Sequence, residues 1–228
     1  MACGGIVSEL LALIAPPACA TCGAALGPAG EVMCPDCRRA LPWLRGPRCP
    51  RCALPAPCRP CPAAGAAFDA AWAPMAYAGT AREAVARLKF GRALALVDLM
   101  AAQMAANAPA QLVRGRMVVA VPLHRSRRRA RGFNQAERLA GALARRLELP
   151  LGPCLVRRGP PSRQAGAGRR ARLSGGRLEV VAVGDAPGRA LLVDDVHTTG
   201  ATLDACARAL RRRGARSVVC LAYARALP

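Results

Sequence analysis

The sequence predicts an α/β protein, a parallel β-sheet flanked by helices, preceded by a small cysteine-rich module with two four-cysteine sites. Apolar runs of strand length alternate with helical segments from about residue 67 to the end of the chain. The run at 189–196 is almost continuously apolar, which is typical of a strand buried on both faces of a parallel sheet. Four Cys-x-x-Cys pairs precede these elements. We therefore expect two domains, residues 1–66 and 67–228.

The expected elements of the second domain follow one another in a regular order. Apolar residues at helical spacing predict that 80–107 is helical with a break near Gly91, and that 132–148 is an amphipathic helix. The buried face of the latter is expected to carry Phe133, Ala136, Leu139, Ala140 and Leu143. A further helix is expected at 201–213. Strands are expected at 71–79 (an edge strand), 116–123, 178–183, 189–196 (a central strand) and 217–224 (the closing strand).

The composition is that of a folded protein with a strongly basic surface. A hydrophobic fraction of 53% excludes a largely disordered chain of 228 residues. The net charge of +21 favours polyanionic partners such as phosphorylated metabolites or nucleic acid, and a generic basic surface is the alternative. The apolar N-terminal stretch is interrupted by Glu9 and is far shorter than a membrane span. It predicts a short docking helix, and we expect no membrane span.

The cysteine pairs predict two structural zinc sites, and redox-active Cys-x-x-Cys motifs or disulfides are the alternative. Eleven residues separate the first pair from the second, eleven the second from the third, and five the third from the fourth. Two Cys-x-x-Cys turns supply the four thiolates of one tetrahedral site, so eight cysteines make two sites. Sequential pairing is the simpler arrangement, and interleaved pairing is the alternative. Reduced, metal-binding cysteines also predict a cytoplasmic location. The predicted ligands are Cys19, Cys22, Cys34, Cys37, Cys49, Cys52, Cys58 and Cys61.

Two carboxylates end the predicted central strand. Asp194 and Asp195 stand at its carboxyl end, where open parallel sheets bind ligands. The loop Thr198–Thr202 then leads into a helix, and it offers hydroxyls, backbone N–H groups and a helix N-terminus to an anion. No GxxxxGK[ST] motif is present, so this is not a P-loop. Acids beside a phosphate site suit ribose hydroxyls or a magnesium ion. Capping of the helix by the acids is the alternative.

The stretch LLVDDVHTTGATL resembles the phosphoribosyl pyrophosphate (PRPP) signature of type I phosphoribosyltransferases. The stretches LKFGR (88–92), VPLHRSRRRARGFNQAERLA (121–140), SRQAG (162–166) and AYAR (222–225) resemble the ComF-type competence proteins. The cysteine block is similar to the double zinc ribbon at the front of that family. This resemblance implies a phosphoribosyltransferase-like domain behind a zinc-ribbon module.

The resemblance also implies roles for individual residues. It implies PRPP, with magnesium, bound by Asp194, Asp195, Thr198, Thr199, Gly200, Ala201 and Thr202. The turn at 121–124, which ends the strand expected at 116–123, falls where such enzymes hold pyrophosphate. The expected contacts are Val121, Pro122, Leu123, His124, Arg125 and Arg131. Residues 157–177 take the place of the mobile loop that closes over the substrate.

Two functions from different classes follow. The first is a PRPP-binding phosphoribosyltransferase or enzyme-like protein, whose acceptor no motif reveals. The second is a single-stranded DNA-binding module that acts with other DNA-uptake proteins in natural transformation or DNA utilisation, the role that the resemblance implies. A protein-interaction scaffold is a third class. The arginine run at 125–131 is either a solvated loop face or a contact for pyrophosphate or nucleic acid.

Overall fold

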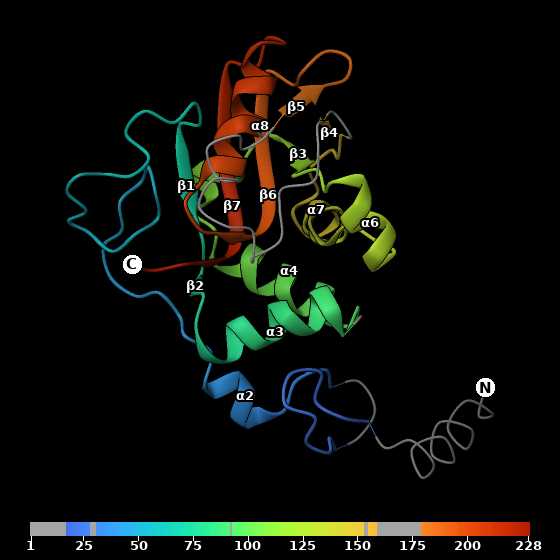
Figure 1. Cartoon of the computed structure of the whole chain (residues 1–228). Helices are drawn as coiled ribbons and strands as arrows, with labels where there is room; N and C mark the ends of the chain where they lie inside the picture. Colours follow the sequence, from blue (N-terminus) through green and yellow to red (C-terminus); the bar gives the residue numbers. More distant parts are fainter. Residues whose placement is uncertain (1–16, 28–30, 92, 153–154, 159–178) are drawn as a thin grey trace, which may run out of the picture.

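A five-stranded parallel β-sheet forms the centre of the molecule in the computed structural model, which describes residues 17–27, 31–91, 93–152, 155–158 and 179–228. The strand order is β1-β7-β6-β3, and β2 also pairs with β7 (Figure 1). The strands are β1 (Ala70–Trp72), β2 (Met75–Ala76), β3 (Met117–Ala120), β6 (Arg189–His197) and β7 (Ser217–Arg225). The predicted parallel sheet is confirmed.

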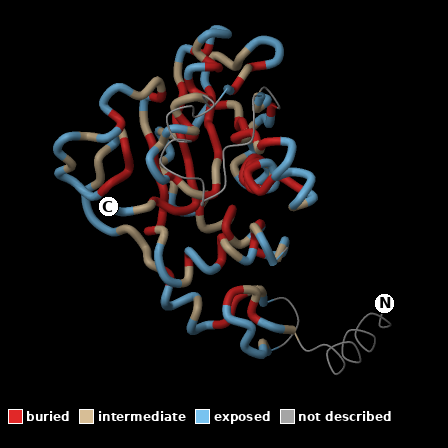
Figure 2. Tube along the Cα trace, viewed as in Figure 1, coloured by how far each residue is buried: buried red, intermediate tan, exposed pale blue. Residues whose placement is uncertain are grey.

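The strands β6 and β7 lie at the centre of the sheet, and hydrophobic cores cover both of their faces. Leu191 and Val193 of β6 belong to one hydrophobic core, whereas Ala190 and Leu192 belong to the other. Successive side chains of a strand point to opposite faces, so a strand between two cores must be apolar throughout. Figure 2 shows buried residues running along these strands, while the cysteine-rich loops are largely exposed. The last strand of the chain, β7, lies between β6 and β1 rather than at an edge.

Helices cover the two faces unequally. The core on one face takes residues from α3 (Gly79–Phe90), α4 (Leu96–Asn107) and α7 (Gln135–Leu147), and the core on the other from α8 (Ala201–Arg211). A short helix, α5 (Ala110–Val113), precedes β3. The predicted break near Gly91 is confirmed, since α3 ends at Phe90. The residues predicted for the inner face of the helix at 132–148 are all buried.

Three elements differ from the sequence prediction. The strand expected at 71–79 is two strands, because Pro74 has no N–H to donate to the sheet. The strand expected at 178–183 is β5 (Glu179–Ala182), which pairs antiparallel with β4 (Leu155–Arg158) in a separate two-stranded sheet. The arginine run forms a helix, α6 (Arg125–Arg131), and not a loop. His124 caps its start and Gly132, at φ 82°, its end.

The cysteine-rich part packs against both faces of the α/β part. Met33 and Leu41, which flank the helix α2 (Pro35–Arg39), share a core with α3 and α4, whereas Leu54 shares a core with α8. Figure 1 shows α2 and the cysteine-rich loop before it beyond α3, and the cysteine-rich loops after it beside β1. The predicted N-terminal helix and most of the loop at 157–177 lie outside the described residues. Within the described part of the chain, no helix has the length and apolar character needed to cross a bilayer.

Candidate functional site

The eight paired cysteines form two four-thiol clusters. Cys19, Cys22, Cys34 and Cys37 make the first cluster, Cys49, Cys52, Cys58 and Cys61 the second, and the sulfurs within each lie within 4.8 Å of one another. The pairing is therefore sequential, which decides between the two arrangements left open by the spacing. The Sγ–Sγ distances of Cys22–Cys34 and Cys49–Cys61 are 3.8 and 3.7 Å. Zn–S bonds of about 2.3 Å in a tetrahedron place neighbouring sulfurs about 3.8 Å apart, so the residues fit zinc.

Backbone donors prepare these thiols for a metal. The N–H of Cys34 donates to the Sγ of Cys19 over 3.3 Å, and the N–H of Cys37 donates to the Sγ of Cys34 over 3.5 Å. Burial raises the pKa of the Cys19 thiol, but backbone N–H groups outweigh it and lower the pKa to about 6. The pKa of Cys49 is likewise lowered to about 6, because hydrogen bonds from Cys58 and from backbone groups outweigh burial. Each cluster thus has one thiol that ionises readily, and a thiolate is the form that binds zinc.

A pocket lies at the carboxyl end of β6, where the two aspartates stand. The N–H of Val121 donates to the carbonyl of Val193 over 3.0 Å, so the turn after β3 lies directly beside Asp194. We call the cavity between them, of about 230 Å³, the strand-end pocket. Its lining residues are Lys89, Val121, Pro122, Leu123, Arg127, Arg131, Asn134, Gln135, Arg157, Asp194, Asp195, Val196, Thr198 and Thr202.

The two aspartates have different environments. Asp195 is buried and forms an ion pair with Lys89, whose Nζ lies 2.7 Å from its Oδ1. Asp194 accepts a hydrogen bond from the N–H of Asp195 over 2.9 Å. Burial and the neighbouring Asp195 charge raise the pKa of Asp194 to about 7. Near neutral pH one carboxylate is therefore compensated within the protein, while the other is held ready for an external cation or a hydroxyl donor.

The threonine loop (Thr198–Thr202) joins β6 to α8 in a conformation that requires glycine. Gly200 has φ 83°, and a Cβ at this position would lie 2.9 Å from Nε2 of His197. Burial lowers the pKa of His197 to about 4, so this imidazole is neutral and supports the loop from below. Within the described residues, the N–H groups of Gly200 and Thr202 donate to no protein acceptor. These N–H groups and the threonine hydroxyls are available to an anion.

Basic side chains line the other side of the strand-end pocket. Arg127 and Arg131 come from α6, and Arg157 comes from β4. Burial lowers the pKa of Arg157, and its buried Nε has no hydrogen-bond partner in the described structure. The side-chain nitrogen of Gln135 is also buried without a partner there. Unsatisfied donors around a cavity are costly, and an oxygen-rich anion would satisfy them.

Arg225 connects the threonine loop to the second cluster. Its guanidinium is buried, and it donates to the carbonyls of Cys52 and His197 over 2.8 Å and also to the carbonyl of Thr198. Burial lowers the pKa of Arg225, whereas the thiols of Cys52 and Cys61 raise it. A zinc ion with four thiolates has a charge of about −2, which would compensate this buried cation. The metal cluster and the loop thus share one buried arginine.

Replacement of Arg225 by methionine should destabilise the protein by about 2–3 kcal/mol, because it leaves buried carbonyls of both segments without donors. Denaturant unfolding of the zinc-loaded protein measures this change. The matched control is Arg212→Met at an exposed position in the turn after α8, where we expect a change within about 0.5 kcal/mol. Equal stability of the two variants would contradict the role given to Arg225.

The structure brings together part of the site predicted from the sequence. Asp194, Asp195, Thr198 and Thr202 line the strand-end pocket with Val121, Pro122, Leu123 and Arg131. Thr199, Gly200 and Ala201 line an adjoining hollow on the side of the second cluster, together with Pro62 and Phe68. His124 caps α6 and Arg125 is exposed on that helix, and neither lines the strand-end pocket.

Two basic residues of the pocket are absent from the binding residues predicted from the sequence, although Arg157 begins the stretch 157–177 that is expected to be a mobile loop. Lys89 lies at the end of α3 and pairs with Asp195, and Arg157 reaches the pocket from β4. Lys89 carried a signal, since it is the only lysine in an arginine-rich chain and belongs to the LKFGR stretch. Asn134 caps α7 and also donates to the carbonyl of Val121 over 3.0 Å, which fixes the turn beside the pocket.

Comparison with known proteins agrees with this architecture. A family model described as a double zinc ribbon domain matches residues 10–69. "Competence protein F" of Haemophilus influenzae is 35% identical over 114 residues, which are 48% of this chain and 50% of that protein. The chain thus matches about half the length of this relative.

Solved structures give only a partial likeness. The glutamine PRPP amidotransferase from B. subtilis, complexed with ADP and GMP, has a TM-score of 0.39 at 19% identity, over 57% of this chain and 26% of that one. The adenine phosphoribosyltransferase from Rhodothermus marinus has a TM-score of 0.34 at 22% identity, over 60% and 68%.

The parallel sheet and the two thiol clusters define the class, an α/β protein with a double zinc ribbon. More particularly, the chain is similar to Competence protein F over about half the length of that protein, and residues 10–69 match the double zinc ribbon domain.

Proposed function

We propose that this chain binds PRPP with magnesium in the strand-end pocket and acts in DNA uptake. One observation carries the proposal: two strand-end carboxylates and the two ends of the threonine loop, Thr198 and Thr202, line the same pocket as a set of cations. PRPP needs all three, because it combines a phosphate, a ribose and a pyrophosphate in one molecule.

Each part of the pocket suits one part of that ligand. The threonine loop would hold the 5′-phosphate through its hydroxyls and N–H groups. Asp194 and Asp195 would accept hydrogen bonds from the ribose hydroxyls. The turn at 121–123, with Lys89, Arg131 and the other pocket arginines, would hold the pyrophosphate, since guanidinium groups match phosphate geometry. Magnesium would reduce the charge of the pyrophosphate, and oxygen ligands such as Asp194 suit it.

Calorimetry with PRPP and magnesium on the zinc-loaded protein tests the proposal. Saturable binding is expected, and it should be lost when both Asp194 and Asp195 are replaced by asparagine. Inorganic phosphate and ribose 5-phosphate, as separate titrants, should bind more weakly, because each fills only part of the pocket. Absence of PRPP binding by the intact protein would overturn the proposal.

Gly200→Val is expected to weaken PRPP binding by at least about tenfold. A valine at φ 83° is strained, and its Cβ meets His197, so the loop must move. Gly214→Val is the matched control, because Gly214 has φ 96° and open space around it at the other end of α8. The control should lose stability and keep its affinity for PRPP in the same calorimetric titration. Equal loss of affinity in both variants would count against the loop.

Transfer of the phosphoribosyl group is a separate question from binding. An enzyme would break the bond between the anomeric carbon and pyrophosphate and join that carbon to an acceptor. Catalysis would then come from positioning and charge stabilisation by the pocket residues rather than from a protein nucleophile. Release of pyrophosphate on addition of an acceptor would establish the transferase, whereas saturable binding without release would favour PRPP as an effector.

DNA handling is the second part of the proposal. It is supported by the similarity to Competence protein F and by the net charge of +21. It is also supported by the five arginines of α6, of which only Arg131 is partly buried. Single-stranded DNA and other DNA-uptake proteins are the proposed partners, in the cytoplasm. Mutation can separate the two activities, because asparagine at 194 and 195 should abolish PRPP binding and leave the binding of single-stranded DNA intact. Loss of both together would contradict separate sites.

A further inference from the structure

A hollow on the ribbon side of the molecule contains both tryptophans of the chain. The hollow, of about 410 Å³, is formed by the segment that joins the two thiol clusters, the β1–β2 break and the end of α4. It is lined by Trp43, Leu44, Arg45, Arg48, Trp72, Pro74 and Asn107. We call it the tryptophan hollow. It is distinct from the strand-end pocket, with which it shares no lining residue.

Main-chain hydrogen bonds hold the backbone of the hollow in place. Residue 43 forms an antiparallel bridge with Met75 of β2, and the N–H of Leu44 donates to the carbonyl of Pro74 over 2.8 Å. The N–H of Ala76 donates to the carbonyl of Pro42 over 2.9 Å. These main-chain bonds fasten the segment between the clusters to the sheet. The Trp43 side chain packs against the core beside these bonds and is only partly buried, so that part of it remains exposed.

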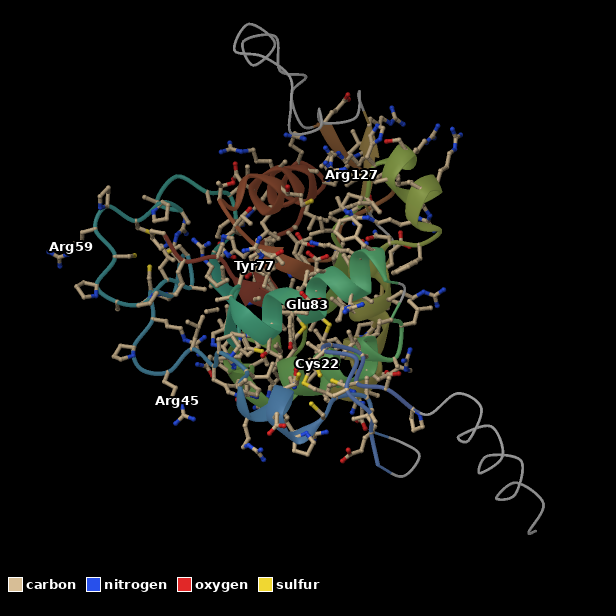
Figure 3. The ribbon with its side chains drawn as sticks, turned by 60° about the horizontal axis from the view of Figure 1, so that its bottom comes forward. Cys22, Arg45, Arg59, Tyr77, Glu83 and Arg127 are labelled. Atoms are coloured by element: carbon tan, nitrogen blue, oxygen red, sulfur yellow. The ribbon has the colours of Figure 1, made fainter. Side chains whose placement is uncertain are left out.

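The chemistry of the hollow is aromatic and cationic. The guanidinium of Arg48 stacks over the Trp72 ring at 4.7 Å from its centroid and donates to the carbonyl of Ala73, so its plane is fixed. Arg45 is exposed, and among the described residues it has no ion-pair or hydrogen-bond partner. Figure 3 shows Arg45 projecting outward from the ribbon part. None of the described residues that line the hollow carries a carboxylate.

An aromatic face beside a free guanidinium selects a narrow class of ligand. A nucleobase stacks on an indole or a guanidinium plane, and the adjacent phosphate pairs with a cation. In a duplex the base faces are already stacked on each other, so only an unpaired strand offers them. An acidic peptide would satisfy the arginines but would leave the aromatic face unused.

We propose that the tryptophan hollow binds one nucleotide of single-stranded nucleic acid, with the base on Trp43 and the fixed Arg48 plane and a flanking phosphate on Arg45. This inference rests on the DNA-handling part of the proposed function and is independent of PRPP binding. It places a subsite for single-stranded nucleic acid in the tryptophan hollow, away from the threonine loop.

Intrinsic fluorescence tests the subsite directly, because the only two tryptophans of the chain both line it. Titration of the full-length, zinc-loaded protein with an oligothymidylate should quench this fluorescence, whereas PRPP should leave it unchanged. The Trp72→Phe variant retains Trp43 and should keep the quench. The Trp43→Phe variant retains only Trp72, which Arg48 covers, and should lose most of it.

Affinity measurements by fluorescence anisotropy of a labelled oligothymidylate provide the quantitative test. Trp43→Ala should lower the affinity by about 5- to 100-fold, the usual effect of losing one base–aromatic stack. Trp43→Phe should lower it less. Arg59→Ala is the matched control for Arg45→Ala, since Arg59 is an exposed arginine in the second cluster's loops (Figure 3). Arg45→Ala should have the larger effect. Zinc content confirms that each variant is folded.

Three results would overturn the inference. One is strand binding that Trp43→Ala and Arg45→Ala reduce no more than Arg59→Ala does, which would leave non-specific charge as the cause. Another is a duplex or a polyglutamate peptide that quenches as strongly as the single strand. The third is no strand binding at all, which would also refute the DNA-handling part of the proposed function and leave PRPP binding untouched.

Discussion

Removal of zinc is expected to unfold the ribbon part of the protein and to release two metal ions per chain. This part has few buried apolar residues, and structural zinc contributes about 10–16 kcal/mol per site in small zinc domains. Atomic emission of the purified protein should therefore give two zinc ions per chain. Chelation should abolish the protease resistance of residues 17–66, as seen by limited proteolysis with mass spectrometry.

The two clusters should differ in their effect on the ligand pocket. Cys52→Ser and Cys34→Ser are each expected to reduce the zinc content to one ion per chain. Only Cys52→Ser should weaken PRPP binding, by about tenfold or more, because the Cys52 carbonyl holds Arg225, which in turn holds the threonine loop. Cys34→Ser is the matched control, since the first cluster packs near α3 and α4. An equal effect of both variants on PRPP binding would contradict the connection through Arg225.

Asp194→Asn is expected to lose PRPP binding by about a hundredfold and to gain stability above pH 7. The raised pKa means that the native state binds more protons than the unfolded chain between about pH 4 and 7. The free energy of unfolding contributed by this group therefore falls as the pH rises through that range. Asparagine keeps an acceptor for the N–H of Asp195 and removes the charge. At pH 8 we expect a gain of about 2 kcal/mol, and almost none at pH 4.

Paired denaturant unfolding curves at each pH measure this difference, and they cancel any pH dependence that the zinc clusters add to both proteins. The matched control is Asp98→Asn in α4, an exposed carboxylate that lies 3.5 Å from Arg145 and should change stability by less than about 1 kcal/mol at either pH. A variant less stable than the native protein at pH 8 would show that the ionised Asp194 carboxylate does not destabilise the folded state. Unchanged PRPP affinity would remove Asp194 from the binding site.

Local patterns were sufficient for the strands and helices with strong periodicity. The central strand at 189–196, the helix at 201–213 and the helix at 132–148 were each predicted within a few residues of β6, α8 and α7. The arginine run was different. Its charges suggested a loop, but α6 forms because His124 and Gly132 cap a segment of good helix formers. The charge of this segment did not indicate its backbone conformation, because exposed arginines occur in helices as well as in loops.

The partners of the site residues depend on long-range packing. Lys89 and Asp195 lie far apart in the sequence, and they meet because α3 ends at the carboxyl end of β6. Arg225 reaches Cys52 only because β7, the last strand, lies at the centre of the sheet beside β1. The meeting of Trp43 and Trp72 in one hollow has a similar cause, since the segment between the clusters bridges to β2. No local spacing specifies such contacts.

The sequence alone determined the class of the fold, the eight metal-binding cysteines and the acidic strand end with its threonine-glycine loop. These features are local, because a short spacing is enough to specify a metal-binding turn, a buried strand or a helix start. Only the tertiary structure decided the sequential pairing of the clusters, the cations that face Asp194 and Asp195, and the buried arginine between metal and loop. Tertiary packing determines these contacts, because a buried charge can pair only with groups that the folded chain brings close to it.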